Sequence, residues 1–116
     1  MLKAEFFILN DGKIKGFDIS GHSGYAESGK DIVCAAVSSA AYMVANTITE
    51  VLNKVRITVC GKEFALQTEE SAGYMRLLVH DKYLSDCGYI LQGFKNHLLM
   101  LEEMYSKNIK VFYKEV

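Results

Sequence analysis

The stretch LKAEFFILNDGKIKGFDIS, residues 2–20, decides how the amino-terminal part of the chain folds. Apolar and charged residues alternate on both sides of the Asn-Asp-Gly sequence at residues 10–12. Two alternating runs joined by a short turn with Asp-Gly are typical of a β-hairpin, because glycine adopts the backbone angles that tight turns require. We therefore expect residues 2–9 and 13–20 to form two antiparallel strands.

A glycine-rich loop and a long helix follow this hairpin. Residues 21–30 contain three glycines and two serines, a composition typical of a loop. From Asp31 to about residue 52, apolar residues recur at steps of three and four, which predicts an α-helix. Asp31 is the expected N-cap, because its carboxylate can accept the unpaired backbone N–H groups of the first turn. The face expected in the core consists of Val33, Ala36, Val37, Ala40, Val44, Ile48 and Val51.

A second hairpin is expected in the middle of the chain. Residues 55–68 are typical of a strand with a possible break at Gly61, and residues 74–80 are typical of another strand. Residues 69–73, between them, have the composition of a turn.

The remaining residues predict a second helix and a last strand. Residues 81–88 are expected to be irregular, whereas apolar residues at helical spacing from Ile90 to Tyr105 predict a helix. Residues 109–113 alternate again. The predicted order is ββαββαβ, an α+β fold with two layers, in which two helices pack on a mostly antiparallel sheet of about five strands.

Composition limits the class of protein. With 116 residues, half of them apolar, the chain is expected to form one globular domain over residues 1–116. The net charge of −1 argues against a large nucleic-acid interface. No uninterrupted apolar run approaches the roughly 20 residues that span a bilayer, and Glu5 interrupts the first one, so neither a membrane segment nor a signal peptide is expected. Three cysteines without C-x-x-C spacing indicate free thiols in a reducing compartment, which predicts a cytoplasmic protein.

The strongest chemical signal is Cys34, which the expected N-cap places in the first turn of the helix. Unpaired N–H groups and the positive end of the helix dipole favour the thiolate there, and the thiolate is the nucleophilic form. His22 lies twelve residues earlier, in a loop that could bring its imidazole to the sulfur. A cysteine and a histidine are sufficient for nucleophilic catalysis. A cysteine that serves only packing is the alternative interpretation.

Two other kinds of site are less well supported. Residues 24–31, GYAESGKD, come close to the phosphate loop G-x-x-x-x-G-K-[ST]. Their last residue, Asp31, would repel a phosphate and lacks the hydroxyl that binds magnesium in that motif. The histidines and cysteines show no spacing typical of zinc ligands, so neither a metal site nor a cofactor is expected.

The order GHSGYA at residues 21–26, then Gly29, then DIVCAAVS at residues 31–38 resembles a known family, the ribosomal-processing cysteine proteases called Prp. The family pattern is G-H-x-G, a short gap, G-x-D, two aliphatic residues, Cys, small residues and Ser. One departure is Ser23, where relatives commonly have alanine, and we expect it to leave the chemistry unaffected.

The resemblance implies a cytoplasmic bacterial endopeptidase without a cofactor. Family members remove a short N-terminal extension from a large-subunit ribosomal protein, the twenty-seventh in the standard naming, and they are typically homodimers. The resemblance implies Cys34 as nucleophile and His22 as general base and then acid, with an acyl-enzyme intermediate. An oxyanion would be held by backbone N–H groups at or near Cys34. The implied partner is the N-terminal peptide of the ribosomal protein.

The other residues of the pattern are implied to support the site. Asp31 is expected either to cap the helix only or also to orient the histidine. Ser38 lies one turn beyond the cysteine and could hydrogen-bond near the site. Gly21, Gly24 and Gly29 would let the loop close over a peptide.

Two functions of other classes stay open on the sequence alone. The first is a ribosome-associated domain that binds peptide or RNA without catalysis. The second is a thiol redox or acyl-transfer protein, against which the absence of a second nearby cysteine argues.

Overall fold

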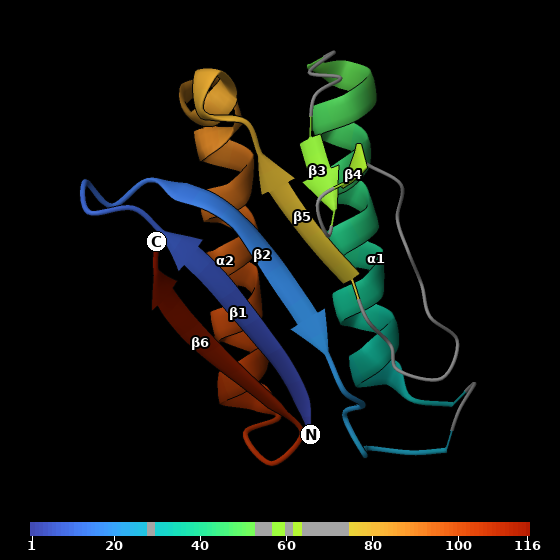
Figure 1. Ribbon diagram of the computed structural model, residues 1–116. Coiled ribbons are helices and arrows are strands. Elements are labelled where there is room, and N and C mark those ends of the chain that lie inside the picture. Colours follow the sequence, from blue (N-terminus) through green and yellow to red (C-terminus); the bar gives the residue numbers. More distant parts are fainter. Residues whose placement is uncertain (28–29, 53–56, 60–61, 64–74) are drawn as a thin grey trace.

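The computed structural model describes residues 1–27, 30–52, 57–59, 62–63 and 75–116. In these residues, strands form one mixed sheet, and two α-helices cover one of its faces (Figure 1). The strands are β1 (Leu2–Ile8), β2 (Ile14–Ser20), β3 (Ile57–Val59), β4 (Lys62–Glu63), β5 (Met75–Val79) and β6 (Ile109–Glu115). The helices are α1 (Ile32–Asn46) and α2 (Leu84–Met104). The prediction of an α+β fold with two helices is confirmed.

The first hairpin forms as the sequence predicts. β1 and β2 pair antiparallel, from Lys3 opposite Ser20 to Ile8 opposite Ile14. Gly12 has a φ of +88° in the turn, a conformation that a residue without a side chain adopts at no steric cost. The hairpin places the end of β2 next to the amino terminus of the chain (Figure 1). The glycine-rich loop begins at this end of β2.

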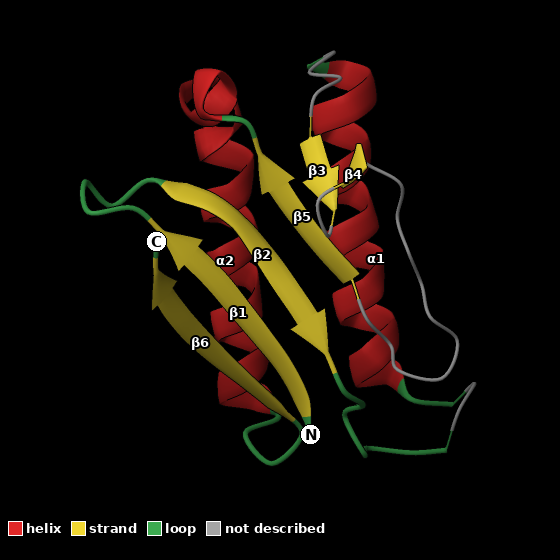
Figure 2. Ribbon diagram, in the orientation of Figure 1, coloured by secondary structure: helices red, strands yellow, loops and turns green. Residues whose placement is uncertain are grey.

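The predicted sheet of about five strands in the order ββαββαβ was wrong in detail. In the described residues the sheet has the order β4-β3-β5-β2-β1-β6. The described part of residues 55–68 forms two short strands, β3 and β4, where one strand was expected (Figure 2). Together with β5, the described residues therefore place three strands between α1 and α2 along the chain. β3 pairs antiparallel with β5, as the second predicted hairpin required. Gly61 and the predicted turn at residues 69–73 lie outside the described residues.

The sheet is mixed because the first and last strands of the chain, β1 and β6, pair in parallel. β6 lies beside β1 in the same direction, from Leu2 opposite Ile109 to Ile8 opposite Glu115. The other strand pairs of the described residues are antiparallel. Residue alternation predicts that a segment is a strand, but not which strand lies beside it.

The helix α1 begins as predicted and ends differently. It is followed by a π-helical turn, Thr47–Val51, in which the N–H of Leu52 donates to the carbonyl of Thr47 at 2.8 Å. This wider turn changes the face that the helix presents, and Val51 is 76% exposed although it was expected in the core. The buried residues of the segment are Val33, Val37, Ala41, Val44, Ala45 and Ile48.

The helix α2 begins earlier than predicted. A 3₁₀ turn, Asp81–Tyr83, leads directly into it at Leu84, so the expectation that residues 81–88 are irregular was wrong. Cys87 is fully buried in its first turns, and packing of this kind outweighs the low helix propensity of the neighbouring Gly88. Met104, the last residue of the helix, is 62% exposed.

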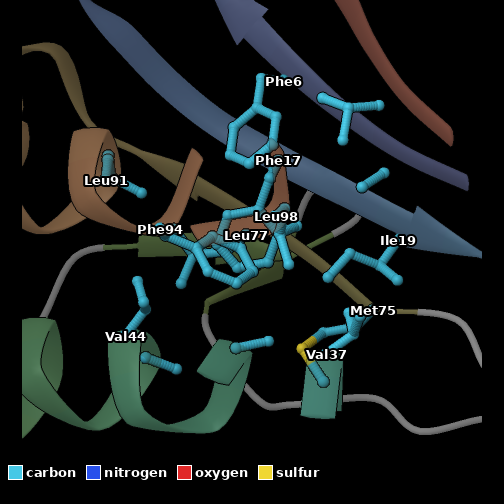
Figure 3. Packing of buried hydrophobic residues seen from close by; sticks show 14 of the residues in the cluster. Phe6, Phe17, Ile19, Val37, Val44, Met75, Leu77, Leu91, Phe94 and Leu98 are labelled. Carbon is cyan, nitrogen blue, oxygen red and sulfur yellow. The ribbon is translucent and has the colours of Figure 1, made fainter. Parts of the chain in front are cut away.

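The core lies between the sheet and the helices, and three phenylalanines form its centre (Figure 3). The ring of Phe17 on β2 contacts that of Phe94 on α2, with ring centroids 4.7 Å apart in an edge-to-face arrangement. Phe6 on β1 contacts the same helix residue at 5.7 Å. Val37 and Val44 of α1 reach the core from the other helix (Figure 3). These contacts fix α1, and therefore its first turn, relative to the sheet.

The helical segment Ile32–Val51 is long and apolar enough, by length and composition alone, to cross a membrane. The expectation that no segment approaches this length counted only uninterrupted apolar runs. Helices packed in a protein core pass the same test, and Val33, Val37 and Val44 of this segment lie in the core. The segment is therefore only weak support for a membrane span.

Candidate active site

A pocket of about 540 Å³ lies where the loop after β2 meets the first turns of α1. It is lined by His22, Gly24, Ala26, Asp31, Cys34, Ala35 and Ser38. Five of these are residues that the sequence analysis singled out. The loop and the helix therefore bring the predicted nucleophile and the predicted base onto one pocket.

Cys34 lies in the first turn of α1 and is half-buried. Its Sγ accepts a hydrogen bond from the backbone N–H of Ser23, with the two atoms 3.4 Å apart. The loop that carries His22 is therefore hydrogen-bonded directly to the sulfur in the first turn of the helix.

Asp31 is the N-cap of α1, as predicted. Its Oδ1 accepts from the backbone N–H of Val33 at 3.1 Å and from that of Cys34 at 3.0 Å. Its Oδ2 accepts from the hydroxyl of Ser23. Burial by itself would raise the pKa of Asp31, but the hydrogen bonds from Ser23, Cys34 and Val33 outweigh it and hold the pKa below its ordinary value. The carboxylate is therefore charged at neutral pH and ties the loop to the helix.

The first backbone donors of α1 are already in use. Asp31 accepts the N–H groups of Val33 and Cys34 through its carboxylate, and that of Ala35, at 3.1 Å, through its carbonyl. A developing oxyanion would therefore compete with these bonds. The donor that points at the sulfur comes from the loop, from Ser23, and not from the helix start that the sequence analysis favoured.

Ser23 is the residue whose importance the sequence analysis missed. Among the described residues, Ser23 is the one polar residue that is buried, with 2% of its surface exposed. Besides its bonds to Cys34 and Asp31, its Oγ accepts from the N–H of Tyr25 at 3.1 Å. Its carbonyl accepts from Nδ2 of Asn108 at 3.1 Å. The departure from the family pattern therefore adds a hydroxyl that donates to Asp31, the N-cap of α1.

The remaining predicted site residues lie as follows. His22 and Ser38 are exposed at the pocket. Gly21 and Gly24 have φ of +79° and +70°, and a Cβ on Gly21 would lie 2.5 Å from the carbonyl oxygen of Met1. These two glycines shape the loop rather than merely loosen it. Gly29 lies outside the described residues. In the part of the chain that the structure describes, no three His, Cys, Asp or Glu side chains are placed to hold a metal ion.

An α+β domain that places a helix-start cysteine and a loop histidine on one pocket has the arrangement of a cysteine hydrolase. Comparison with known families agrees with this class. The chain matches the family described as cysteine protease Prp over residues 1–110, and it belongs to that family. It is therefore a cysteine protease, a hydrolase.

Similar proteins match over nearly their whole length. The ribosomal processing cysteine protease Prp of Staphylococcus aureus is 25% identical over 98% of this chain and 100% of its own. The protein of the same name from Bacillus subtilis is 25% identical over 96% of each chain. A crystal structure of the S. aureus protease with a covalently linked product peptide has a TM-score of 0.83 at 26% identity, and covers 98% of this chain and 100% of its own.

Proposed function

We propose that this chain is a ribosomal processing protease that removes the N-terminal extension of a large-subunit ribosomal protein, the twenty-seventh, with Cys34 as nucleophile and His22 as base. One observation carries the proposal: both side chains line one pocket, and the Sγ of Cys34 accepts a backbone N–H from the loop that holds His22. The relatives named as ribosomal processing proteases support the choice of substrate. The S. aureus structures with a substrate peptide and a product peptide support a peptide ligand.

The reaction would proceed through an acyl-enzyme. His22 takes the proton of the Cys34 thiol, and the sulfur attacks the carbonyl carbon of the scissile peptide bond. The carbon–nitrogen bond breaks as His22 gives the proton to the leaving amine. A water molecule, deprotonated by His22, then attacks the thioester. The carbon–sulfur bond breaks, the product acid leaves, and the sulfur of Cys34 takes back the proton from His22 for the next cycle.

The neighbouring residues would prepare this pair. Asp31 acts as cap and as anchor of the loop, because its two oxygens bond the helix and the Ser23 hydroxyl separately. Ser38 lies exposed at the pocket one turn beyond Cys34, where its hydroxyl can meet the bound peptide. Gly24 leaves open space beside the loop, because a Cβ at that position would meet no atom within 4 Å. The family's homodimer and a cytoplasmic location stay predictions.

The experiment that tests the proposal uses a peptide spanning the extension and the mature start of the host's ribosomal protein. We expect the wild-type chain to cut it once and Cys34→Ser to leave it uncut, as read by mass spectrometry. Cys87→Ser is the matched control, since Cys87 is buried in α2 away from the pocket lining, and it should keep the activity. Cleavage by Cys34→Ser above a few per cent of wild type would contradict a thiolate mechanism.

A non-enzymatic binding domain is the alternative, and the same experiment separates the two. Such a domain would bind the peptide without cutting it, and Cys34→Ser would bind as the wild type does.

A further inference from the structure

The connection between α2 and β6 contacts the loop that carries His22 and Ser23. Nδ2 of Asn108 donates to the carbonyl of Ser23, 85 residues earlier in the chain, at 3.1 Å. Beside it, the rings of Tyr105 and Tyr25 meet edge to face, with centroids 5.6 Å apart. Figure 1 shows this connection at the same end of the sheet as the amino terminus and the loop after β2.

The backbone of Asn108 is itself held by two hydrogen bonds. Its backbone N–H donates to the carbonyl of Tyr105 at 2.8 Å, and its carbonyl accepts from the N–H of Leu2 at 2.9 Å. The first of these bonds fixes it to the end of α2, and the second fixes it to the start of β1. The amide that reaches Ser23 is therefore held by the rigid part of the fold.

Ser23 is bound at each of its polar groups. Its N–H is bonded to Sγ of Cys34, its hydroxyl to Asp31 and its carbonyl to Asn108. The residue is almost completely buried, so the carbonyl that loses the Asn108 donor is left without a partner unless the residue shifts. Loss of this anchor lets Ser23 move as a whole, and its N–H then moves away from the sulfur.

We propose that Asn108 is a positioning residue of this protease, which acts through the Ser23 carbonyl to keep the Ser23 N–H on the sulfur of Cys34. The inference rests on the proposed function in taking Cys34 as the nucleophile. Asn108 contacts no reacting atom in this role. Its effect is on the hydrogen bond from the Ser23 N–H to the sulfur, and hence on how fast Cys34 reacts with an electrophile.

The test measures the alkylation of Cys34 by iodoacetamide in the intact chain, resolved by peptide mass spectrometry. In Asn108→Ala and Asn108→Asp, which both lack the donor, we expect alkylation about tenfold slower at neutral pH, as for loss of one hydrogen bond to a charged group. Asn108→Gln keeps an amide donor and should recover part of the rate. Asn96→Ala, exposed on α2, is the matched control and should match the wild type.

The direction of the rate change and the recovery in Asn108→Gln separate positioning from a merely structural role. A loop that is only loosened would expose the half-buried Cys34, and alkylation would become faster, which would overturn the proposal. An unchanged rate in folded Asn108→Asp would overturn it as well, and so would a rate in Asn108→Gln as slow as that in Asn108→Ala. Circular dichroism and the slow alkylation of buried Cys87 establish that each variant is folded.

The outcome does not depend on the protease assay. If Cys34→Ser cuts the peptide, the proposed function fails, whatever the alkylation rates are. If Cys34→Ser is inactive and the Asn108 variants react like the wild type, only the role of Asn108 fails. In the cleavage assay, the donor-less variants should lower kcat and leave KM within about twofold, since Asn108 is absent from the pocket lining.

Discussion

Loss of the Asp31 carboxylate should destabilise the fold by an amount that depends on pH. Asp31→Ala removes an N-cap that accepts two backbone N–H groups, which costs about 1–2 kcal/mol. It also removes a negative charge from the positive end of α1 and the bond from the Ser23 hydroxyl, which together add about 1 kcal/mol. We therefore expect a loss of about 2–3 kcal/mol for alanine at neutral pH. Asp31→Asn keeps the shape of the cap and should lose only about 1 kcal/mol.

The sign of the pH dependence follows from the direction of the pKa shift. Burial alone would raise the pKa of Asp31, but the hydrogen bonds that it accepts from Ser23 and the helix start lower it below 3.8. The charged carboxylate therefore contributes stability that is fully present above 3.8, the value in the unfolded chain. That contribution is lost as the pH falls through the lower value of the folded chain. The deficit of Asp31→Asn should accordingly be full at neutral pH and shrink in acid.

The assay is urea denaturation followed by circular dichroism, at neutral pH and at several acid values. Glu103→Gln, at an exposed position on α2, is the control for loss of one carboxylate, and its free energy of unfolding should stay within about 0.5 kcal/mol of wild type. In thermal scans a loss of 2 kcal/mol should lower Tm by about 8 °C. A deficit of Asp31→Asn that is the same at all pH values, or an alanine variant as stable as wild type, would refute the reasoning.

Two further predictions concern the core. Gly16→Ala should destabilise the chain severely, because its Cβ would lie 2.0 Å from the carbonyl oxygen of Leu77 and force β2 away from β5. Gly93→Ala, in open space on α2, is its control and should raise Tm slightly, since alanine favours a helix by up to about 1 kcal/mol. Phe94→Ala should cost about 3–5 kcal/mol in urea denaturation, because the ring packs on Phe17 and leaves a cavity. A loss below 1 kcal/mol would show that the cavity collapses.

Features set by neighbours in the sequence could be predicted from the sequence. The Asp-Gly turn specifies the β1–β2 hairpin, and Asp31 caps a helix whose first donors are two and three residues away. The spacing between His22 and Cys34 predicted that one pocket would hold both. In each case the interacting groups are connected by a short piece of chain, whose local conformation decides the contact.

Features set by distant residues could not be predicted in this way. The bond from Asn108 to Ser23 spans 85 residues, and neither residue type signals the other. The early start of α2 depends on the burial of Cys87, which outweighs the glycine beside it. The Ser23 hydroxyl looked unimportant because its partners are backbone and carboxylate groups that become close only when the loop folds over α1.

The parallel pairing of β1 with β6 has a consequence for how the chain reaches its folded state. Leu2 lies opposite Ile109, so this ladder closes only after almost the whole chain has been brought back on itself, which is a slow kind of contact to make. The β1–β2 hairpin needs only a short turn and can form early. Until β6 docks, β1 is an edge strand with unpaired N–H and C=O groups, which a second chain can occupy. A high protein concentration during refolding speeds the pairing with a second chain but not the docking of β6, and should therefore favour aggregates or strand-exchanged pairs over the correctly folded chain.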